Sequence, residues 1–270
     1  MEHNKDSLVS IILPCSRVDS FLEQSLNSIL SQTYRNFELI IIANGVSEEE
    51  LFLLEKMSKT DGRIKLLHTL IKGLAFALNL AIHEAKGVFV ARMDADDISH
   101  KDRIKKQVEF LEANPDYSVV GCKVDLIDEN NQILSKKFPF YEHHQEISKI
   151  ICLRNVMCHP ALMFRKESLL AVGAYKFGFM SEDHELFIRM ICQNMKFYNL
   201  PLHLFSYRRH SAQITNISHA WKHFYEISSF LYIHAFVDRK FKCLLGAVIV
   251  FPPVRVLHTF LRRIYSKKGR

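Results

Sequence analysis

The first 115 residues alternate between short apolar segments and longer segments with helical periodicity. The apolar segments lie at residues 8–14, 37–43, 63–68 and 87–91. Apolar residues recur every three or four positions at 21–30, 47–59, 74–85 and 100–113. Because the segments at 8–14, 37–43 and 87–91 are apolar at nearly every position, they predict strands that are buried on both faces of a sheet. The sequence therefore predicts an α/β domain with a mostly parallel sheet flanked by helices.

The second half of the chain has a less regular pattern. Strands are expected at 117–128 and 132–138 around a turn at 129–131, and again at 202–210. Helices are expected at 142–153, 181–193 and 218–236, and residues 160–166 suggest a strand that enters a short helix. At helix starts, Ser16 with Asp19 forms a plausible capping box, and Ser181 is a plausible N-cap.

Three groups of residues follow directly after predicted parallel strands. They are Pro14-Cys15, Asn44-Gly45 and the acidic cluster Asp94, Asp96 and Asp97. Ligands of parallel α/β sheets bind outside the carboxyl ends of the strands, so these groups should converge on one cleft. Clustered carboxylates suit Mg²⁺ or Mn²⁺. The alternative is a solvated acidic turn that caps the next helix, which Asp97 could do while supporting the site.

The composition indicates a globular protein with one sizeable core, or with one core and a small appendage. The chain has 270 residues, 48% of them hydrophobic, and a polar N-terminus without the apolar run of a signal peptide. Its six cysteines contain no CxxC pair, which favours reduced thiols in a cytosolic protein over a disulfide framework or a zinc site.

Positive charge is concentrated at the C-terminus. The formal net charge is +7, but residues 239–270 hold nine lysines and arginines and no acid, which leaves about −2 for the rest. A nucleic-acid-binding domain would carry its charge on the folded body, so no nucleic-acid partner is expected. The apolar run 243–251 is too short to span a bilayer. The tail is therefore either a membrane-surface helix or a helix that packs on the domain or on a second subunit.

Several motifs, in order, resemble those of inverting family 2 glycosyltransferases with the GT-A fold. They are "VSIILPCSR", "LEQSLNSILSQTYRNFELIIIANG", "KGLAFALNLAIHEAKGVFVARMDADDI", "CHPALMFRK", "SEDHELFIRM" and "YRRHSAQIT". The resemblance implies a GT-A domain at 1–216, with a nucleotide-sugar-binding half at 8–115 and an acceptor-side half at 116–216. Residues 217–270 would then form a helical, basic C-terminal extension.

The resemblance also implies roles for individual residues. Asp96 and Asp94 would hold Mn²⁺ or Mg²⁺, with Asp96 touching the metal and Asp94 facing the ribose or a metal-bound water. Asp183 would be the general base. Glu182 is the alternative base. A purely structural alternative is that Glu182 and Asp183 only complement the dipole of the helix that they begin.

Five further residues are candidates for contact with the nucleotide sugar or the metal. Arg208 and His210 alternate along the last strand and point to one face, where they suit a diphosphate and a metal; a solvated basic strand end is the alternative. Lys72 precedes a helix whose N-terminus could attract phosphate. Pro14 and Asn44 would line the nucleotide pocket. The family often has an aspartate where Asn44 stands, so base preference is left open. His159 lines the acceptor side or packs in the core.

The expected activity is transfer of a hexosyl or N-acetylhexosaminyl group from a nucleotide diphosphate sugar, with UDP-sugar as the expected donor. The acceptor would be a hydroxyl of a glycan or lipid-linked molecule in lipopolysaccharide, capsule or other surface polysaccharide synthesis. The expected location is the cytoplasm, with a peripheral position on the inner face of the cytoplasmic membrane if the tail binds lipid. The alternatives are a sugar nucleotidyltransferase and a non-catalytic nucleotide-sugar-binding protein.

Overall fold

A computed structural model describes residues 7–176, 181–210 and 220–254 of the chain. Its strands are β1 (Val9–Cys15), β2 (Phe37–Asn44), β3 (Ile64–Thr69), β4 (Phe89–Arg92), β5 (Ile98–Ser99), β6 (Tyr117–Ile127), β7 (Met163–Arg165) and β8 (Lys196–Arg208). Its α-helices are α1 (Ser20–Leu30), α2 (Glu48–Ser58), α3 (Leu74–Glu84), α4 (Arg103–Ala113), α5 (His144–Ile150), α6 (Lys166–Ala171), α7 (Glu182–Cys192), α8 (Ala220–Phe236) and α9 (Lys242–Val250).

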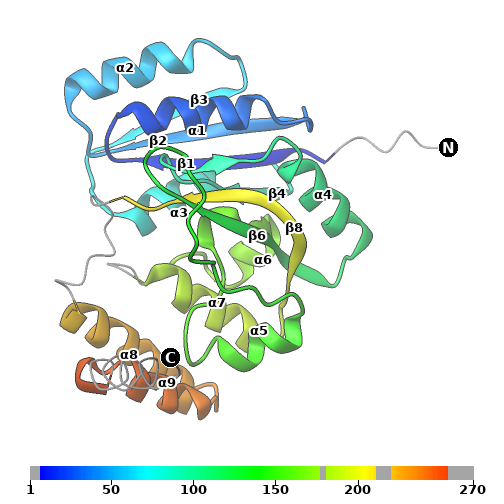
Figure 1. Ribbon diagram of the computed structural model, residues 1–270, viewed down its shortest axis with the longest axis vertical. Helices are drawn as coiled ribbons and strands as arrows, with labels where there is room; N and C mark the ends of the chain where they lie inside the picture. Colours follow the sequence, from blue (N-terminus) through cyan, green and yellow to red (C-terminus); the bar gives the residue numbers. More distant parts are fainter. Residues whose placement is uncertain (1–6, 177–180, 211–219, 255–270) are drawn as a thin grey trace.

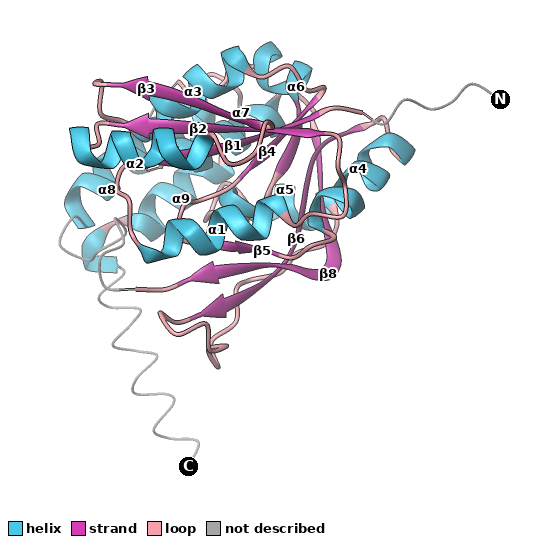
Figure 2. Ribbon diagram, turned by 90° about the horizontal axis from the view of Figure 1, so that it is seen from above, coloured by secondary structure: helices cyan, strands magenta, loops and turns pink. Residues whose placement is uncertain are grey.

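The strands form one sheet in the order β3-β2-β1-β4-β7-β6-β8-β5. Neighbours among β3, β2, β1 and β4 are parallel, and β6 is parallel to β8. The short strands β7 and β5 are antiparallel to their neighbours. The predicted mostly parallel α/β sheet is therefore confirmed, and the carboxyl ends of β1, β2 and β4 lie along one edge (Figure 2).

Each face of the sheet is covered by helices, as the continuous apolar strands predict. Alternate residues of a strand point to opposite faces, so Ile11 packs with α1, α2 and α4 while its neighbour Ile12 packs with α3. The core on the α3 side of the sheet also includes residues of α5, α7, α8 and α9. The α8–α9 hairpin lies at the end of the molecule away from α2 (Figure 1).

Two local predictions were wrong, and a third was right only for the position of a residue. Residues 132–138 form no strand, and only an isolated bridge joins Ile133 to Ile127, because the Asp128 side chain accepts backbone N–H groups that close a turn. Asp19 alone caps α1, accepting from the N–H groups of residues 21 and 22, so Ser16 is not part of a capping box. Ser181 is at the N-cap position of α7, as predicted, but its side chain makes no capping hydrogen bond.

The α8–α9 hairpin packs on the domain through one face of α9. Cys243 and Ala247 are buried there. A Cβ atom on Gly246 would lie 1.9 Å from the carbonyl oxygen of Cys152, so only glycine permits this close approach. The packing alternative is thus confirmed for residues 242–250. The predicted boundary at 216/217 and the basic residues from 255 to 270 lie outside the described residues.

Two further sequence predictions concern the thiols and the membrane. All six cysteines are free, and five of them are buried, as expected for reduced thiols. Within the described part of the chain, every helix is too short or too polar to cross a bilayer.

Candidate active site

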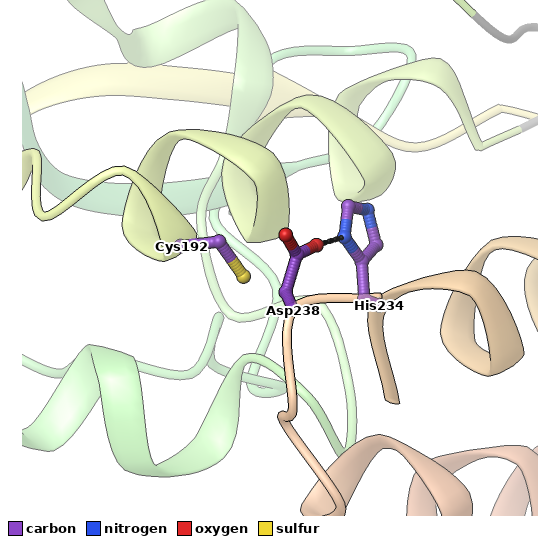
Figure 3. A group of neighbouring side chains, drawn as sticks. All are labelled: Cys192, His234 and Asp238. Carbon is purple, nitrogen blue, oxygen red and sulfur yellow. Dashed lines mark hydrogen bonds and ion pairs between the residues drawn. The ribbon is translucent and has the colours of Figure 1, made fainter. Parts of the chain in front are cut away.

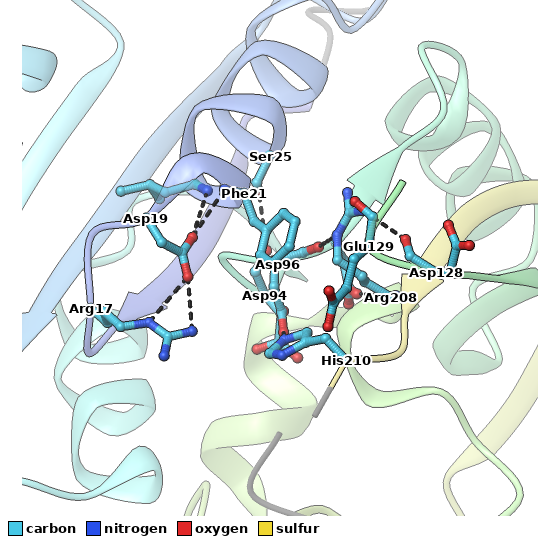
Figure 4. A network of polar contacts seen from close by, with 12 residues as sticks. Arg17, Asp19, Phe21, Ser25, Asp94, Asp96, Asp128, Glu129, Arg208 and His210 are labelled. Atoms are coloured by element: carbon cyan, nitrogen blue, oxygen red, sulfur yellow. Dashed lines mark hydrogen bonds and ion pairs between the residues drawn. The ribbon is translucent and has the colours of Figure 1, made fainter. Parts of the chain in front are cut away.

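The acidic cluster lies immediately after β4, where α1 and the end of β8 approach it (Figure 4). The backbone of this loop is anchored by Ser25 of α1, whose Oγ donates a 2.9 Å hydrogen bond to the carbonyl oxygen of Asp94. Carboxylate oxygens of Asp94, Asp96 and Asp97 lie within 4.8 Å of one another. The sheet and α1 therefore hold three acids close enough to bind one cation.

Burial makes this cluster electrostatically unfavourable without a cation. Desolvation raises the pKa of Asp94, an effect that Arg92 opposes, and the charge of Asp96 raises it further. Desolvation and the neighbouring carboxylates raise the pKa of Asp97 well above its usual range. The Oδ2 atom of Asp97 is buried without a hydrogen-bond partner among the described residues. An oxygen-rich, anionic site with one unsatisfied carboxylate oxygen fits a hard divalent cation.

Asp97 supports the site and does not cap the next helix. Its Oδ1 atom accepts the backbone N–H of Arg208 at 2.8 Å. The residue that precedes α4 is instead Asp102. The helix-capping interpretation of Asp97 was therefore wrong, and its contact with β8 ties the acidic loop to the last strand.

Arg208 and His210 both contact Asp96, in agreement with the prediction that they point to one face. Arg208 Nε donates to the carbonyl oxygen of Asp96 at 2.7 Å, and His210 Nε2 lies 2.9 Å from Asp96 Oδ2. The Phe21 ring packs against both, with Arg208 Cζ 4.4 Å from its centroid. Because Arg208 is fully buried and also donates to the carbonyl of Asp128, it fixes the loop backbone, whereas a contact with diphosphate stays a prediction.

The predicted nucleotide-pocket residues come together at the ends of β1 and β2. Asn44 Oδ1 accepts the N–H of Gly73 at 3.3 Å, which joins the end of β2 to the start of α3. Gly45 has a positive φ of 67°, and the Lys72 side chain lies where a Cβ of residue 45 would be. Pro14 is buried beside β2. The structure thus groups Pro14, Asn44 and Lys72, but their contact with a nucleotide is still a prediction.

A second pair of carboxylates lies at the N-terminus of α7. Asp183 Oδ2 accepts a 2.7 Å hydrogen bond from Asn155 Nδ2, and Asp183 Oδ1 accepts from the backbone N–H of His184. Desolvation raises the pKa of Asp183, although these hydrogen bonds and Arg92 oppose the shift. A buried carboxylate with a raised pKa and a fixed orientation is suited to proton transfer.

Glu182 is buried, and His159 and Tyr175 lie beside it. Its Oε1 atom is 3.9 Å from His159 Nδ1, and His159 Nε2 is 2.6 Å from the Tyr175 hydroxyl. Burial lowers the pKa of His159 well below its usual value, so the ring is neutral. Desolvation, followed by repulsion from Asp183, raises the pKa of Glu182 to about 8. The structure therefore favours a structural His159, packed in the core.

Arg92 links the two carboxylate groups. It is 3% exposed and forms an ion pair with Asp94. Its charge also lowers the pKa of Asp183 and of Glu182. The last residue of β4 thus provides one buried positive charge within electrostatic range of both groups, which places them in the same region of the molecule.

The raised pKa of Glu182 predicts a pH-dependent stability. In the fold the carboxyl keeps its proton to about pH 8, whereas its ordinary pKa is 4.5. Between these values the folded state binds the extra proton, so the free energy of unfolding should fall as pH rises. Glu182→Gln should reduce this loss. Urea unfolding at pH 5 and pH 8 measures the change in the free energy of unfolding. Glu55→Gln, on the exposed surface of α2, is the control and should show the same change as wild type.

Three residues of the site were not among the predicted site residues. They are Arg92, Asn155 and Tyr175, which contact or electrostatically influence the predicted acids. A signal existed only for Arg92, because an arginine at the end of an apolar strand requires a buried counterion. Asn155 and Tyr175 become recognisable only once the fold brings them to α7 and His159.

Comparisons with known proteins identify the family of this chain. The model of the family described as glycosyl transferase family 2 matches residues 10–173, more than half of the chain. The O-antigen biosynthesis glycosyltransferase WbnJ of Escherichia coli is 37% identical over 227 residues, which cover 83% of this chain and 87% of WbnJ. The amylovoran biosynthesis glycosyltransferase AmsE of Erwinia amylovora is 28% identical, over 67% of each chain.

Solved structures show the same fold at low sequence identity. S. aureus TarS 1-349, in complex with UDP-GlcNAc, has a TM-score of 0.68 at 16% identity, over 84% of this chain and 66% of that chain. The mannosyltransferase PcManGT from Pyrobaculum calidifontis, in complex with GDP-Man and Mn²⁺, has a TM-score of 0.63 at 15% identity. The match covers 95% of this chain and 79% of PcManGT. The chain therefore belongs to glycosyltransferase family 2 and is a glycosyltransferase with the GT-A fold.

Proposed function

We propose that the enzyme transfers a sugar from a nucleotide diphosphate sugar to a hydroxyl group, with inversion at the anomeric carbon. The observation that carries this proposal is the cluster of three carboxylates after β4, with the unsatisfied Oδ2 atom of Asp97 inside it. Asp94 and Asp96 would hold Mn²⁺ or Mg²⁺, as sequence analysis predicted. When bound, the cation supplies Lewis-acid stabilisation of the leaving diphosphate.

The residues around the cluster would orient the donor. His210 contacts Asp96 Oδ2. It would either orient this carboxylate, which binds the metal, or bind the metal itself. Arg208 holds the loop backbone and provides positive charge behind it. Lys72 at the start of α3 would contact the diphosphate, because helix N-termini and ammonium groups both favour phosphate oxygens.

Asp183 is the residue we propose as general base. Inverting transfer needs one base that removes the proton of the acceptor hydroxyl on the face opposite the leaving group. Asn155 fixes one oxygen of Asp183, and burial raises its pKa, which makes the ionised form a stronger base. Glu182, whose pKa of about 8 keeps it protonated at neutral pH, is the weaker candidate.

The donor we favour is a UDP-sugar that carries a hexosyl or N-acetylhexosaminyl group. TarS, whose fold this chain shares, is in complex with UDP-GlcNAc, whereas PcManGT is in complex with GDP-Man, so the fold alone allows either base. Asn44 would lie beside the base. Its Oδ1 atom already accepts the N–H of Gly73, so its contribution to the base would come mainly from the amide donor.

We place the reaction in the synthesis of a surface polysaccharide, on a glycan or lipid-linked acceptor at the inner face of the cytoplasmic membrane. WbnJ, a relative at 37% identity, is an O-antigen biosynthesis glycosyltransferase. The outer face of the α8–α9 hairpin supports lipid contact, since Leu245, Val248 and Ile249 are exposed there. Arg239 and Lys240 precede α9 and would meet anionic headgroups.

Donor turnover tests the reaction. The purified enzyme is incubated with Mn²⁺ and a panel of UDP- and GDP-sugars, and release of the nucleoside diphosphate is measured. One UDP-sugar should be hydrolysed slowly or should protect the protein against heat. Release of pyrophosphate from a nucleoside triphosphate and sugar phosphate would instead identify a nucleotidyltransferase, and binding without any turnover on acceptor glycans would favour a non-catalytic role.

Membrane contact is tested on the exposed face of α9. Leu245→Ser with Val248→Ser should weaken binding to vesicles that contain anionic lipid by about tenfold or more, because each buried aliphatic side chain contributes on the order of 1 kcal/mol. Phe52→Ser with Leu53→Ser, on exposed positions of α2, is the matched control and should leave binding unchanged. Equal vesicle binding by both double variants would exclude α9 as the contact.

A further inference from the structure

A second group of ligand-type side chains lies at the other end of α7 (Figure 3). Cys192 is the last residue of α7, His234 lies on α8 and Asp238 follows α8. Their sulfur, nitrogen and oxygen atoms lie within 4.8 Å of one another, and His234 Nδ1 is 2.6 Å from Asp238 Oδ2. Cys192 is nine residues beyond Asp183, or about 14 Å along the helix, so this group is separate from the catalytic acids.

The second nitrogen of His234 faces a buried acid. Glu185 Oε1 lies 3.8 Å from His234 Nε2. Glu185 is itself held by Arg189, which donates 2.7 Å hydrogen bonds to both of its carboxylate oxygens. A carboxylate behind the non-ligating nitrogen is the arrangement that orients a metal-bound histidine. The imidazole therefore has a ligand set on one side and an orienting acid on the other.

The charges around His234 also suit a divalent cation. His234 Nδ1 lies 2.6 Å from Asp238 Oδ2 and His234 Nε2 lies 3.8 Å from Glu185 Oε1, so a carboxylate faces each ring nitrogen. These surroundings stabilise a positive charge. A thiolate, a carboxylate and a neutral imidazole would balance the two charges of a divalent ion, while Glu185 is balanced by Arg189.

The geometry points to a zinc site formed by Cys192, His234 and Asp238. A mixed sulfur, nitrogen and oxygen set is typical of Zn²⁺, whereas Mg²⁺ and Mn²⁺ prefer oxygen ligands like those after β4. Three protein ligands leave a fourth position for water. No zinc spacing is visible in the sequence because the thiol is far along the chain from the other two ligands.

The zinc ion would fasten the C-terminal hairpin to the helix that carries the catalytic acids. At the N-terminus of α7, Glu226 of α8 already accepts the N–H of Ser181 at 3.1 Å. The zinc site would join the same two helices at the opposite end of α7. Both ends of α7 would then be attached to α8, which limits movement of Glu182 and Asp183.

Cobalt substitution tests this site without measuring activity. The metal-free full-length protein is titrated with Co²⁺, and thiolate-to-cobalt charge-transfer absorption is recorded. We expect the band to saturate at one equivalent, to be lost in Cys192→Ser and to disappear when Zn²⁺ is added. Asp96→Asn, which removes a ligand of the oxygen-rich cluster, should keep the band.

Two further variants separate a zinc site from a histidine–carboxylate pair. Asp238→Asn changes an exposed position, so it provides a test even if Cys192→Ser fails to fold. It should weaken Co²⁺ binding at least about tenfold. His203→Gln is the matched control, because it breaks another histidine–aspartate pair, in which His203 Nδ1 lies 2.7 Å from Asp125 Oδ1. This variant should bind Co²⁺ like wild type.

Thermal unfolding gives a second measurement. Zn²⁺ at a hundredfold excess over its dissociation constant should raise the melting temperature of wild type by about 5 °C or more and leave Cys192→Ser unchanged. Absence of a thiolate band in wild type, or a band that persists in Cys192→Ser, would overturn the proposal. His234 would then act as an imidazolium between Asp238 and Glu185.

Discussion

Replacing Asp183 with asparagine should lower kcat by about 10²- to 10⁴-fold while donor binding stays near the wild-type value. The amide has the shape of the carboxylate but cannot accept the acceptor proton. Asn155 and the N–H of His184 both donate to Asp183, so the side chain should stay near its place, with one hydrogen bond weakened. The measurement is kcat for transfer, together with the dissociation constant of the donor from calorimetry.

Glu182→Gln is the comparison that assigns the base. Glu182 keeps its proton to about pH 8, so the amide should mimic the form present at neutral pH, and activity should change by less than about tenfold. If Glu182→Gln were inactive and Asp183→Asn transferred sugar at the wild-type rate, the base would be Glu182. A loss of donor binding in Asp183→Asn would show that the residue acts on the donor side.

Asn155→Ala gives a pH readout for the same assignment. Its hydrogen bond lowers the pKa of Asp183, which burial otherwise raises. Without it the ionised base should appear only at higher pH, so the acidic limb of the kcat profile should move upward. A profile that stays in place would argue that Asp183 does not titrate in the transfer step.

The central sheet was predictable from sequence because its signal is local. Strands such as β1 and β2 are apolar at almost every position, and only a sheet covered on both faces buries such segments. The failed strand at 132–138 shows the limit of the same reasoning. Ile133 is apolar but 72% exposed, and the turn made by Asp128 leaves it without a strand partner beyond one bridge.

The residue types of the site were predictable, but the interactions between them were not. Strand alternation placed Arg208 and His210 on one face, and both do contact Asp96. That Arg208 would be buried and bound to backbone carbonyls depends on how β8 meets the loop after β4. In the same way, the charge of Arg92 reaches Asp183 only because α7 packs beside the sheet, which no spacing in the sequence reveals.

Replacing Asp96 with asparagine should remove metal-supported turnover. An amide is a weaker ligand than a carboxylate, and loss of Lewis-acid stabilisation worth several kcal/mol corresponds to a fall of about 10³-fold or more in kcat. The fold should survive, since Arg208 binds the backbone oxygen of Asp96, which the substitution keeps. His210 also retains an oxygen or amide partner in place of the carboxylate.

The experiment combines the variant with chelator and a surface control. Wild-type transfer should stop in EDTA and return with Mn²⁺ or Mg²⁺, whereas Asp96→Asn should stay inactive at any concentration of either ion. Asp116→Asn, at a side chain that is 76% exposed, should behave like wild type. Mn²⁺ binding in the presence of a nucleoside diphosphate, followed by calorimetry, should weaken only in Asp96→Asn. A reaction that uses a metal at this cluster must depend on the residues that bind the metal. If Asp96→Asn transferred sugar at the wild-type rate in chelator, the role of the acidic cluster would be structural only.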